Sequence, residues 1–304
     1  MSDDSFKHAF AELFGFKEVF DTLEDYDRAS DDPASFNNSC RGLIQYKMLR
    51  GPVLAKDVSM ESFQQAPVYH FLSAPLVGPD RDAWEQAIEL DAELAADVFA
   101  ITDSPVGHGD AFPSEPFHSE CHSKHALMMT LLLSVIGRRR PLKVIEVGGG
   151  FGNMARIAHR LGLVDNWTTF DLDFVCDAKA YFLGETCPQL RVNRNQYDPS
   201  LGAVNLIDQH HCNTIKRELE PVDILIGSEA LGTLPLDSFL YYYDALLPLS
   251  GHLLYAAPAG ASSLEDADDK LRYIEKIMEP EKKLTTRDGQ LEMFVFTRHL
   301  TTES

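Results

Sequence analysis

The sequence is short of basic residues. Its 304 residues include 27 lysines and arginines against 47 aspartates and glutamates, which gives a formal net charge of −20. Binding to duplex nucleic acid or to an anionic membrane surface needs a basic face, because both partners carry phosphate charges. We therefore expect neither a nucleic acid nor a membrane as the partner of this chain.

Cysteine is also scarce, and its spacing does not match a metal site. The five cysteines are Cys40, Cys121, Cys176, Cys187 and Cys212, and none of them forms the Cys-x-x-Cys pair typical of bound zinc. An odd, scattered set of this kind is typical of reduced thiols in the cytoplasm. We expect a cytoplasmic protein without a bound metal.

Long hydrophobic runs are absent from the sequence. The longest apolar stretch, 126–137, contains Thr130 and Ser134 and is shorter than the roughly 20 residues that a membrane span needs. The first residues, Met1-Ser2-Asp3-Asp4-Ser5, lack the apolar segment of a secretory signal peptide. Hydrophobic residues still make up 44% of the chain, which is enough for an ordinary globular core.

The spacing of the apolar residues divides the chain into two parts. Residues 1–116 show mainly helical periodicity, interrupted by prolines between 51 and 80. We expect helices at 6–27, 36–48 and 80–102, which together form a mainly helical N-terminal cap over residues 1–116.

The second part, residues 117–304, alternates between strand and helix patterns. This alternation favours a mainly parallel sheet with helices on both faces. Helices are expected at 118–136, 153–161, 174–185, 237–247 and 265–278. Strands are expected at 143–147, 167–172, 190–193, 203–207, 223–227, 251–256 and 291–298.

The most informative segment joins the first of these strands to the next helix. It reads Val144-Ile145-Glu146-Val147-Gly148-Gly149-Gly150-Phe151-Gly152-Asn153, an apolar strand followed by glycines and a helix start. Glycines permit a tight turn and a close approach of the backbone to a ligand, and the free N–H groups of a helix start attract anions. Since ligands of open α/β sheets bind at the carboxyl ends of the strands, we expect a ligand site here.

Two ligand-binding motifs compete for this turn. The dinucleotide fingerprint needs glycines at its first, third and sixth positions, and the sixth position here is Asn153. The pattern Glu-x-Gly-x-Gly-x-Gly fits throughout, through Glu146, Gly148, Gly150 and Gly152. It is the first motif of the class I S-adenosylmethionine-dependent methyltransferases, which this sequence resembles. A nicotinamide oxidoreductase is the weaker alternative.

The resemblance implies an α/β fold and a cofactor. The fold is the Rossmann-like class I methyltransferase fold, a seven-stranded, mostly parallel sheet whose last strand is antiparallel, and the cofactor is S-adenosyl-L-methionine. Asp171 ends the next expected strand, where a carboxylate can accept hydrogen bonds from both ribose hydroxyls, with Asp173 as the alternative. The residues expected to contact the cofactor are Glu146, Gly148, Gly149, Gly150, Asn153, Asp171, Leu172, Asp208, Gln209 and Ser228.

A closer resemblance is to the sugar O-methyltransferases. It rests on the turn at 146–153, on Asp171-Leu172 and on Ala180-Tyr181-Phe182-Leu183, within the span 140–260. The sequence departs from the family where Thr233 and Leu234 stand in place of Glu and Met. The resemblance implies an enzyme, a transferase that methylates a hydroxyl of a small polar metabolite, with a sugar as the expected acceptor.

A hydroxyl acceptor must lose its proton, so a general base is expected beside it. Glu229 follows the expected strand at 223–227, and His210 and His211 follow the strand at 203–207; these three are the catalytic candidates.

A second group of histidines lies at the start of the expected helix 118–136. His118, His122 and His125 are spaced by four and three residues, which places them on one face of a helix. We expect them to contact the substrate, with ordinary polarity at a helix start as the alternative, and we expect no metal among them.

Two other functions remain open at this point. The chain can be a methyltransferase for a nitrogen or another oxygen of a small molecule, or a non-catalytic protein that retains the cofactor-binding fold. The acidic composition argues against a nucleic-acid acceptor. The sequence leaves the oligomeric state open, a homo-oligomer included.

Overall fold

A computed structural model describes residues 55–56, 58–65, 81–109, 118–138, 140–228, 234, 236–258, 267–289 and 291–299. The helices expected at 6–27 and 36–48 lie outside these residues, as does Glu229. Within the described residues, no helix combines the length and the hydropathy that crossing a membrane requires.

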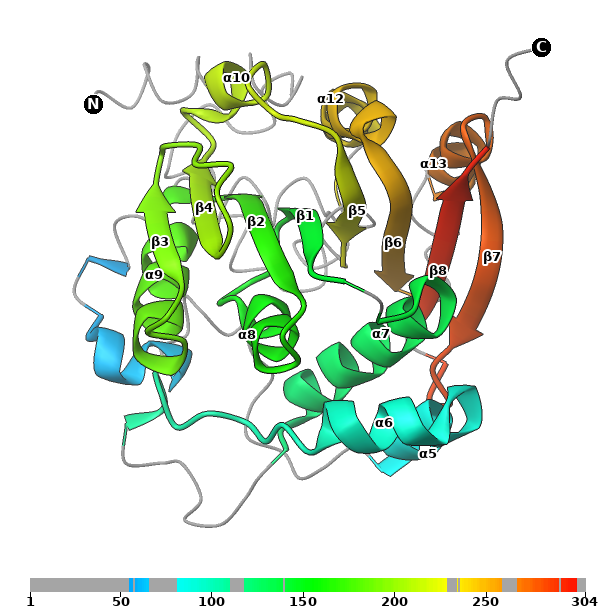
Figure 1. Cartoon of the computed structure of the whole chain (residues 1–304), viewed down its shortest axis with the longest axis horizontal. Helices are drawn as coiled ribbons and strands as arrows, with labels where there is room; N and C mark the ends of the chain where they lie inside the picture. The colour runs from blue at the N-terminus through cyan, green and yellow to red at the C-terminus, as the bar shows by residue number, and fades with distance from the viewer. Residues whose placement is uncertain are drawn as a thin grey trace, which may run out of the picture.

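A single sheet of eight strands forms the centre of the molecule (Figure 1). Its strands run in the order β3-β4-β2-β1-β5-β6-β8-β7. From β3 to β6 all neighbours pair in parallel, whereas β8 is antiparallel to both β6 and β7. The mostly parallel Rossmann-like fold with an antiparallel last strand is thus confirmed. The strands are β1 (Leu142–Val147), β2 (Val164–Asp171), β3 (Arg191–Arg194), β4 (Ala203–Asp208), β5 (Val222–Gly227), β6 (Ser250–Pro258), β7 (Met278–Thr285) and β8 (Leu291–Arg298).

The sheet has one strand more than the predicted seven, and the missed strand is β7. Its sequence, Met-Glu-Pro-Glu-Lys-Lys-Leu-Thr, is mostly charged, and a register shift lies between Pro280 and Lys282. Charged residues, proline and bulges are the features that protect the edge of a sheet from pairing with another chain. The same features hide such a strand from a search for apolar alternation.

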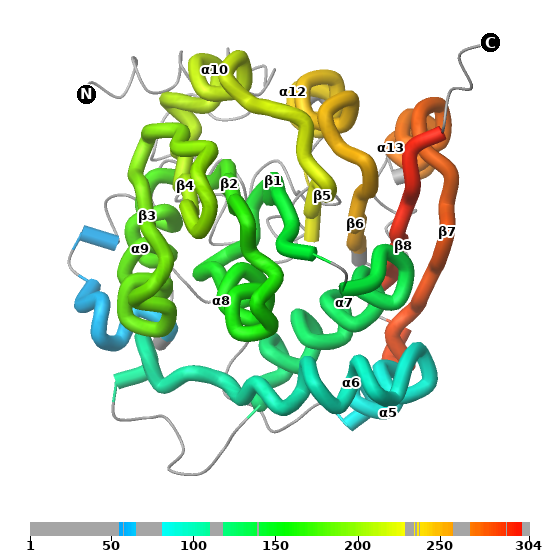
Figure 2. Tube along the Cα trace, in the orientation of Figure 1, coloured from blue at the N-terminus to red at the C-terminus, as the bar shows by residue number. Residues whose placement is uncertain are grey.

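Helices cover both faces of the sheet, which gives three layers (Figure 2). One hydrophobic cluster contains residues of α5 to α9, and the other contains residues of α10, α12 and α13. The helices are α5 (Arg81–Leu90), α6 (Ala92–Phe99), α7 (Glu120–Ile136), α8 (Asn153–Arg160), α9 (Asp173–Thr186), α10 (Cys212–Ile215), α12 (Leu236–Leu246) and α13 (Ala267–Glu275), with short 3₁₀ turns η1 (Met60–Gln65) and η4 (Leu247–Leu249).

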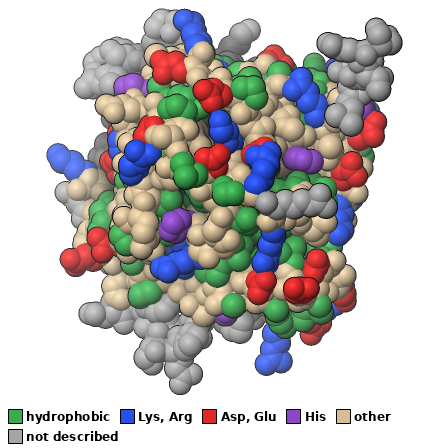
Figure 3. Space-filling model, viewed as in Figure 1, with side chains coloured by type: hydrophobic (Ala, Val, Ile, Leu, Met, Phe, Trp, Pro, Cys, Tyr) green, Lys and Arg blue, Asp and Glu red, His purple; other side chains and the backbone are tan. Residues whose placement is uncertain are grey.

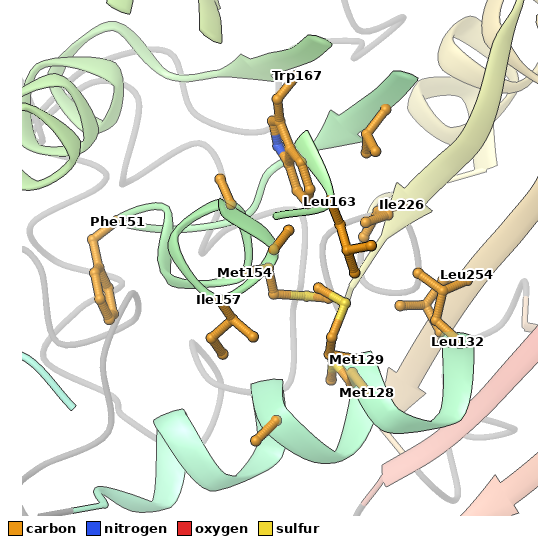
Figure 4. Close-up of a cluster of buried hydrophobic side chains, with 14 of the residues drawn as sticks. Met128, Met129, Leu132, Phe151, Met154, Ile157, Leu163, Trp167, Ile226 and Leu254 are labelled. Atoms are coloured by element: carbon orange, nitrogen blue, oxygen red, sulfur yellow. The ribbon is translucent and has the colours of Figure 1, made fainter. Parts of the chain in front are cut away.

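The central strands are apolar on both sides because each side faces a helical layer. In β1, Val144 packs in one cluster and its neighbour Ile145 packs in the other. Helix α7 is buried on all sides from Ala126 to Leu133, a run in which Thr130 is the one polar residue. Figure 4 shows its Met128, Met129 and Leu132 beside residues of α8 and of the sheet.

The helix expected at 80–102 is divided into α5 and α6. Asp91 stands between them with an extended backbone (φ −168°), and its side chain accepts a hydrogen bond from the N–H of Leu94. An aspartate in this position satisfies a free N–H at a helix start, so it favours a new helix over continuation of the old one.

The order of the strands indicates where a sheet of this kind binds ligands. From β1 the chain passes to β2, β3 and β4 on one side, and β5 and β6 lie on the other side of β1. The direction of the chain therefore reverses between β1 and β5, and crevices at such points hold the ligands of open α/β sheets. The glycine turn after β1 lies at this position.

Candidate functional site

The turn between β1 and α8 has a backbone that favours glycine at four positions. Gly148, Gly149, Gly150 and Gly152 have φ values of 83°, 84°, 55° and 95°. Gly152 precedes α8 and supplies no side-chain acceptor for the N–H groups of its first turn. These groups remain available to a carboxylate or phosphate.

Two of these glycines make room for side chains of the protein itself. A Cβ atom on Gly149 would lie 2.1 Å from Cδ of Glu146, and one on Gly152 would lie 2.8 Å from Cγ of Lys179. Both distances are far below van der Waals contact. The backbone of the turn therefore packs directly against the Glu146 carboxylate and the aliphatic part of the Lys179 side chain.

Glu146 lies beneath the turn and has no exposed surface. Its Oε2 accepts hydrogen bonds from Nε1 of Trp167 (3.1 Å) and Oγ1 of Thr169 (3.2 Å), both on β2. Its Oε1 is buried and has no hydrogen-bond partner among the residues that the structure describes. Burying a carboxylate costs free energy unless a cation lies near, and the nearest is Lys179, whose Nζ is 3.6 Å from Oε2.

Lys179 of α9 is the central residue that the sequence analysis missed. Its side chain is fully buried, and its Nζ donates to the carbonyl oxygen of Gly148 (2.8 Å) and to Oδ2 of Asp171 (3.4 Å). One ammonium group thus joins β1, the glycine turn and the end of β2. A signal was present, because this lysine falls on the apolar face of α9, between Val175 and Leu183.

Asp171 ends β2 beside the turn, where the sequence analysis placed it. Its side chain is 10% exposed, and Oδ1 accepts a hydrogen bond from the N–H of Leu172 (2.8 Å). Burial raises the pKa of Asp171 to about 6, against the opposing effect of the Lys179 ammonium. At neutral pH it is a carboxylate, and each of its oxygens retains an acceptor site.

Asp208 ends β4 and pairs in register with Asp171. Its carboxylate accepts hydrogen bonds from Nδ2 of Asn195 (2.7 Å), Nδ1 of His211 (2.8 Å) and the N–H of His210 (2.8 Å). Burial acts to raise the pKa of Asp208, but the hydrogen bonds from His211 and Asn195 outweigh it and lower the pKa overall. The two carboxylates at this edge of the sheet therefore have opposite shifts.

The other predicted residues of this edge occupy different positions. Gln209 is buried and accepts the N–H of Asp173 (2.9 Å), and Ser228 is buried directly after β5. His210 and His211 are exposed, with the His211 ring held by Asp208. Leu172 precedes α9 as its N-terminal cap residue.

The three histidines before and within α7 do lie together. Nε2 of His122 contacts the carbonyl oxygen of Ile101 (2.6 Å), and Nδ1 contacts Nδ2 of Asn153 (3.0 Å). Burial lowers the pKa of His122 to about 4, so the ring is neutral, donating to Ile101 and accepting from Asn153. The His118 ring lies 5.2 Å from the His122 ring, and His125 also contacts Asn153.

The Asn153 side chain, predicted to contact the cofactor, points toward α7. Its Nδ2 meets His122 and His125, and its Oδ1 accepts from Nε of Arg156 (3.1 Å). Only its backbone is left to face the turn. In the described part of the chain, no three His, Cys, Asp or Glu side chains are arranged to hold a metal ion.

No protein-family model matches this sequence, and no curated protein matches it either. Solved methyltransferase structures are similar to it. Magnesium protoporphyrin IX methyltransferase (ChlM) from Synechocystis PCC 6803 with bound SAH is 14% identical, with a TM-score of 0.41 over 58% of this chain and 84% of that one. The bacterial CtHen1 methyltransferase domain is 14% identical, with a TM-score of 0.43 over 57% and 97%. The mitomycin 7-O-methyltransferase MmcR is 14% identical, with a TM-score of 0.38 over 78% and 70%.

Because these identities and scores are low, the roles of individual residues rest on the geometry of the site. That geometry is a glycine turn after β1, at the point where the chain order of the parallel sheet reverses. Asp171 at the end of β2 and Asp208 at the end of β4 place a carboxylate on each of the two strands beside it.

Proposed function

We propose that this chain is an S-adenosylmethionine-dependent methyltransferase that methylates a hydroxyl of a small polar metabolite, with a sugar as the acceptor class. The observation that carries the proposal is the pairing of the glycine turn after β1 with Asp171 at the end of β2. Lys179 joins the two through the Gly148 carbonyl and the Asp171 carboxylate.

The chemistry of this edge fits such a cofactor. S-adenosylmethionine presents hydroxyl and amine donors that need acceptors, and Asp171 and Asp208 supply carboxylates at adjacent strand ends. The first N–H groups of α8 suit its carboxylate. Glu146, with its unpaired Oε1, adds negative charge beneath the turn, which favours a cationic ligand above it.

When bound, the cofactor supplies a methyl group on a positively charged sulfur, and this chain must orient the acceptor and remove its proton. Asp171 binds the ribose hydroxyls, and the glycine turn holds the amino-acid end. Glu229, His210 and His211 remain the proposed bases. The His211 ring is the best oriented of the described two, because its Nδ1–H donates to Asp208 and leaves Nε2 to accept a proton.

Residues 1–116 are proposed to cover this edge and to select the acceptor. Their described part reaches the carboxyl side of the sheet, since Nε2 of Gln86 in α5 donates to the carbonyl oxygen of Thr285 (2.9 Å) at the end of β7. The turn after β7 lies beside the carboxyl end of β6, because Leu291 pairs with Pro258.

A nucleic acid is a poor acceptor for this surface. On the face shown in Figure 3, basic side chains are interspersed with acidic ones and do not gather into one patch. The net charge of −20 repels a phosphate polymer.

Calorimetric titration with S-adenosylmethionine and S-adenosylhomocysteine tests the proposal. We expect both to bind, and we expect Asp171→Asn to weaken binding at least ~10-fold because it removes a charged acceptor. The matched control is Asp177→Asn, an exposed aspartate of α9 that pairs with Arg194 on the surface. Absence of binding, or displacement by nicotinamide dinucleotide, contradicts the proposal.

Transfer is tested by mass spectrometry on a panel of sugars and sugar-bearing metabolites. We expect a gain of one methyl group on an acceptor of this class. His211→Ala and Glu229→Gln then identify the base, because loss of a positioned base lowers the rate by roughly 10²–10⁴-fold. Methylation of amines alone, with no hydroxyl acceptor, contradicts the proposed acceptor class.

A further inference from the structure

We infer that Lys179 is a positioning residue of this cofactor site, which fixes the glycine turn and the ribose-binding carboxylate relative to each other and sets the charge beneath the ligand. The inference rests on the proposed function and deepens it. No motif of the sequence includes Lys179, and its buried side chain cannot touch a ligand.

The three donors of the ammonium group face three oxygens. Nζ lies 2.8 Å from the carbonyl oxygen of Gly148, 3.4 Å from Oδ2 of Asp171 and 3.6 Å from Oε2 of Glu146. The stem passes under the turn at Gly152, where a Cβ atom would collide with it. The lysine is thus fixed along its length, and it holds the two ligand-facing parts of the site from below.

The charges around Lys179 leave the site negative. Glu146 and Asp171 contribute two negative charges and Lys179 one positive charge, so one negative charge remains when both carboxylates are ionised. Burial raises the pKa of the Cys176 thiol and the Tyr242 hydroxyl, and burial lowers the pKa of His125 to about 4, so all three are neutral. Further charged groups act on these neutral neighbours: Asp208 of β4 and Arg194 of β3 act on Cys176, and Asp103 and Lys124 act on His125.

Lys179 acts on the ligand through Asp171. A neutral carboxylic acid loses an acceptor site and its charge, so a ribose bound by Asp171 is released as the pH falls through the pKa of this group. The ammonium group lowers that pKa, and the Glu146 carboxylate raises it. Removal of the two neighbours therefore shifts the acid limit of binding in opposite directions.

The experiment measures S-adenosylhomocysteine affinity by calorimetry between about pH 5 and about pH 8. For the unmodified protein we expect affinity to fall on the acid side, with a midpoint near the Asp171 pKa of about 6. Lys179→Met keeps the length of the side chain without its charge, and we expect its midpoint to rise by roughly one pH unit or more. Glu146→Gln should lower the midpoint.

The control is Lys216→Met, a half-buried lysine at the end of α10 that stacks on Tyr241, on the other side of the sheet. Its acid midpoint should equal that of the unmodified protein. If Lys179→Met does not fold, the double variant Glu146→Gln/Lys179→Met removes both charges together, and its midpoint should still lie above the original value, because Lys179 lowers the Asp171 pKa more than Glu146 raises it.

The outcomes separate the two proposals. A lower affinity for Lys179→Met with an unchanged midpoint overturns the inference, because it indicates a role in packing only. Equal shifts in the same direction for Lys179→Met and Glu146→Gln overturn it as well. Absence of any S-adenosylhomocysteine binding by the unmodified protein overturns the proposed function, and the inference with it.

Discussion

Two buried polar networks lie on either side of the glycine turn, and they differ in how completely they are paired. The Lys179 network consists of Glu146, Asp171, Lys179 and the Gly148 carbonyl; it leaves Oε1 of Glu146 without a partner and one negative charge uncompensated. The His122 network consists of His122, Asn153, Arg156 and the carbonyls of Ile101 and Thr102.

In the His122 network the hydrogen-bonding groups are matched. Both ring nitrogens of His122 are engaged, and Arg156 donates from Nε to Asn153 and from Nη2 to the carbonyl oxygen of Thr102 (2.6 Å). It ties α7 and α8 to the segment after α6. The difference teaches that the His122 network is matched by hydrogen bonds within the protein, although the neighbouring His118 has a buried Nδ1 without a partner among the described residues. The Lys179 network instead keeps a negative charge beneath the turn.

The largest expected effect comes from breaking the Lys179 network at the turn. In Gly149→Ala, the new methyl group occupies the space of the Glu146 carboxylate, and the positive φ adds strain. We expect S-adenosylhomocysteine affinity to fall at least ~100-fold and the free energy of unfolding to fall by about 3 kcal/mol or more.

Gly162→Ala is the control for this change. Gly162 also has a positive φ (71°), but no atom of the described part of the chain lies within 4 Å of the position that its Cβ would take. Gly162→Ala should lower the free energy of unfolding by about 1–2 kcal/mol, which is the cost of a positive φ for alanine, and it should leave ligand affinity unchanged. If urea unfolding gave equal losses of stability for the two variants, the collision with the Glu146 carboxylate would not contribute to the loss in Gly149→Ala.

The second effect concerns the dependence of stability on pH. Each network contains one buried group with a shifted pKa: the pKa of His122 is lowered and that of Asp171 is raised. The folded pKa of His122 is about 4 against an ordinary 6.5, so the unfolded chain binds the extra proton and stability falls as the pH drops from about 6.5 to about 4. The folded pKa of Asp171 is about 6 against an ordinary 3.8, so the folded chain binds the extra proton and stability rises over the pH drop from about 6 to about 4.

Each contribution amounts to about 3 kcal/mol, at about 1.4 kcal/mol for each unit of pKa shift, and the two oppose each other. Relative to the unmodified protein, Asp171→Asn should therefore lose more stability on acidification, and His122→Gln should lose less. Urea unfolding at several pH values between about 4 and about 7 measures both. Parallel stability–pH curves for the two variants would contradict the assignment.

A third, smaller effect should distinguish a network that stabilises the fold from one that supports ligand binding. Asn153→Ala removes the partner of His122 and Arg156, and we expect it to lower the free energy of unfolding by about 2 kcal/mol, because buried donors and acceptors lose their partners. Affinity for S-adenosylhomocysteine should change less than ~3-fold, because only the backbone of this residue faces the turn. A large loss of affinity with intact stability would instead place the side chain in the ligand site.

The smallest effect is expected at an exposed network. Arg287 after β7 pairs with Asp82 and Glu89 of α5, all of them on the surface. Exposed ion pairs contribute little and are screened by salt. Arg287→Ala should lower the melting temperature slightly at low salt, and the difference should vanish at about 1 M salt. A large effect that persists in salt would show that this contact is as important as the buried ones.

Much of the fold follows from local patterns in the sequence. The apolar strands, the glycine turn, the position of Asp171 and the helix that contains α7 were predicted because each depends on neighbours along the chain. Strand β7 was missed because an edge strand has little apolar content, and the break at Asp91 was missed because a capping side chain is stronger there than helical periodicity.

The balance between the two polar networks could not be predicted in this way. The histidine spacing at 118–125 indicated a functional face, but packing of α7 on α8 engages both nitrogens of His122 with the protein. Lys179 meets Glu146 and Asp171 only because α9 packs against β3 and β4 and its lysine side chain passes beneath the glycine turn. The local pattern marks Lys179 as a lysine on an apolar helix face, but its partners become neighbours only in the assembled sheet.

The position of β8 has a consequence for how the molecule is assembled. β8 follows β6 and β7 in the chain, yet it lies between them and pairs with both. During synthesis these two strands emerge first and have no direct pairing with each other, so both wait with open hydrogen-bonding edges until the third arrives. Any state in which β8 is unpaired therefore leaves the edge of β6 open, and an open edge of this kind can pair with another copy of the chain.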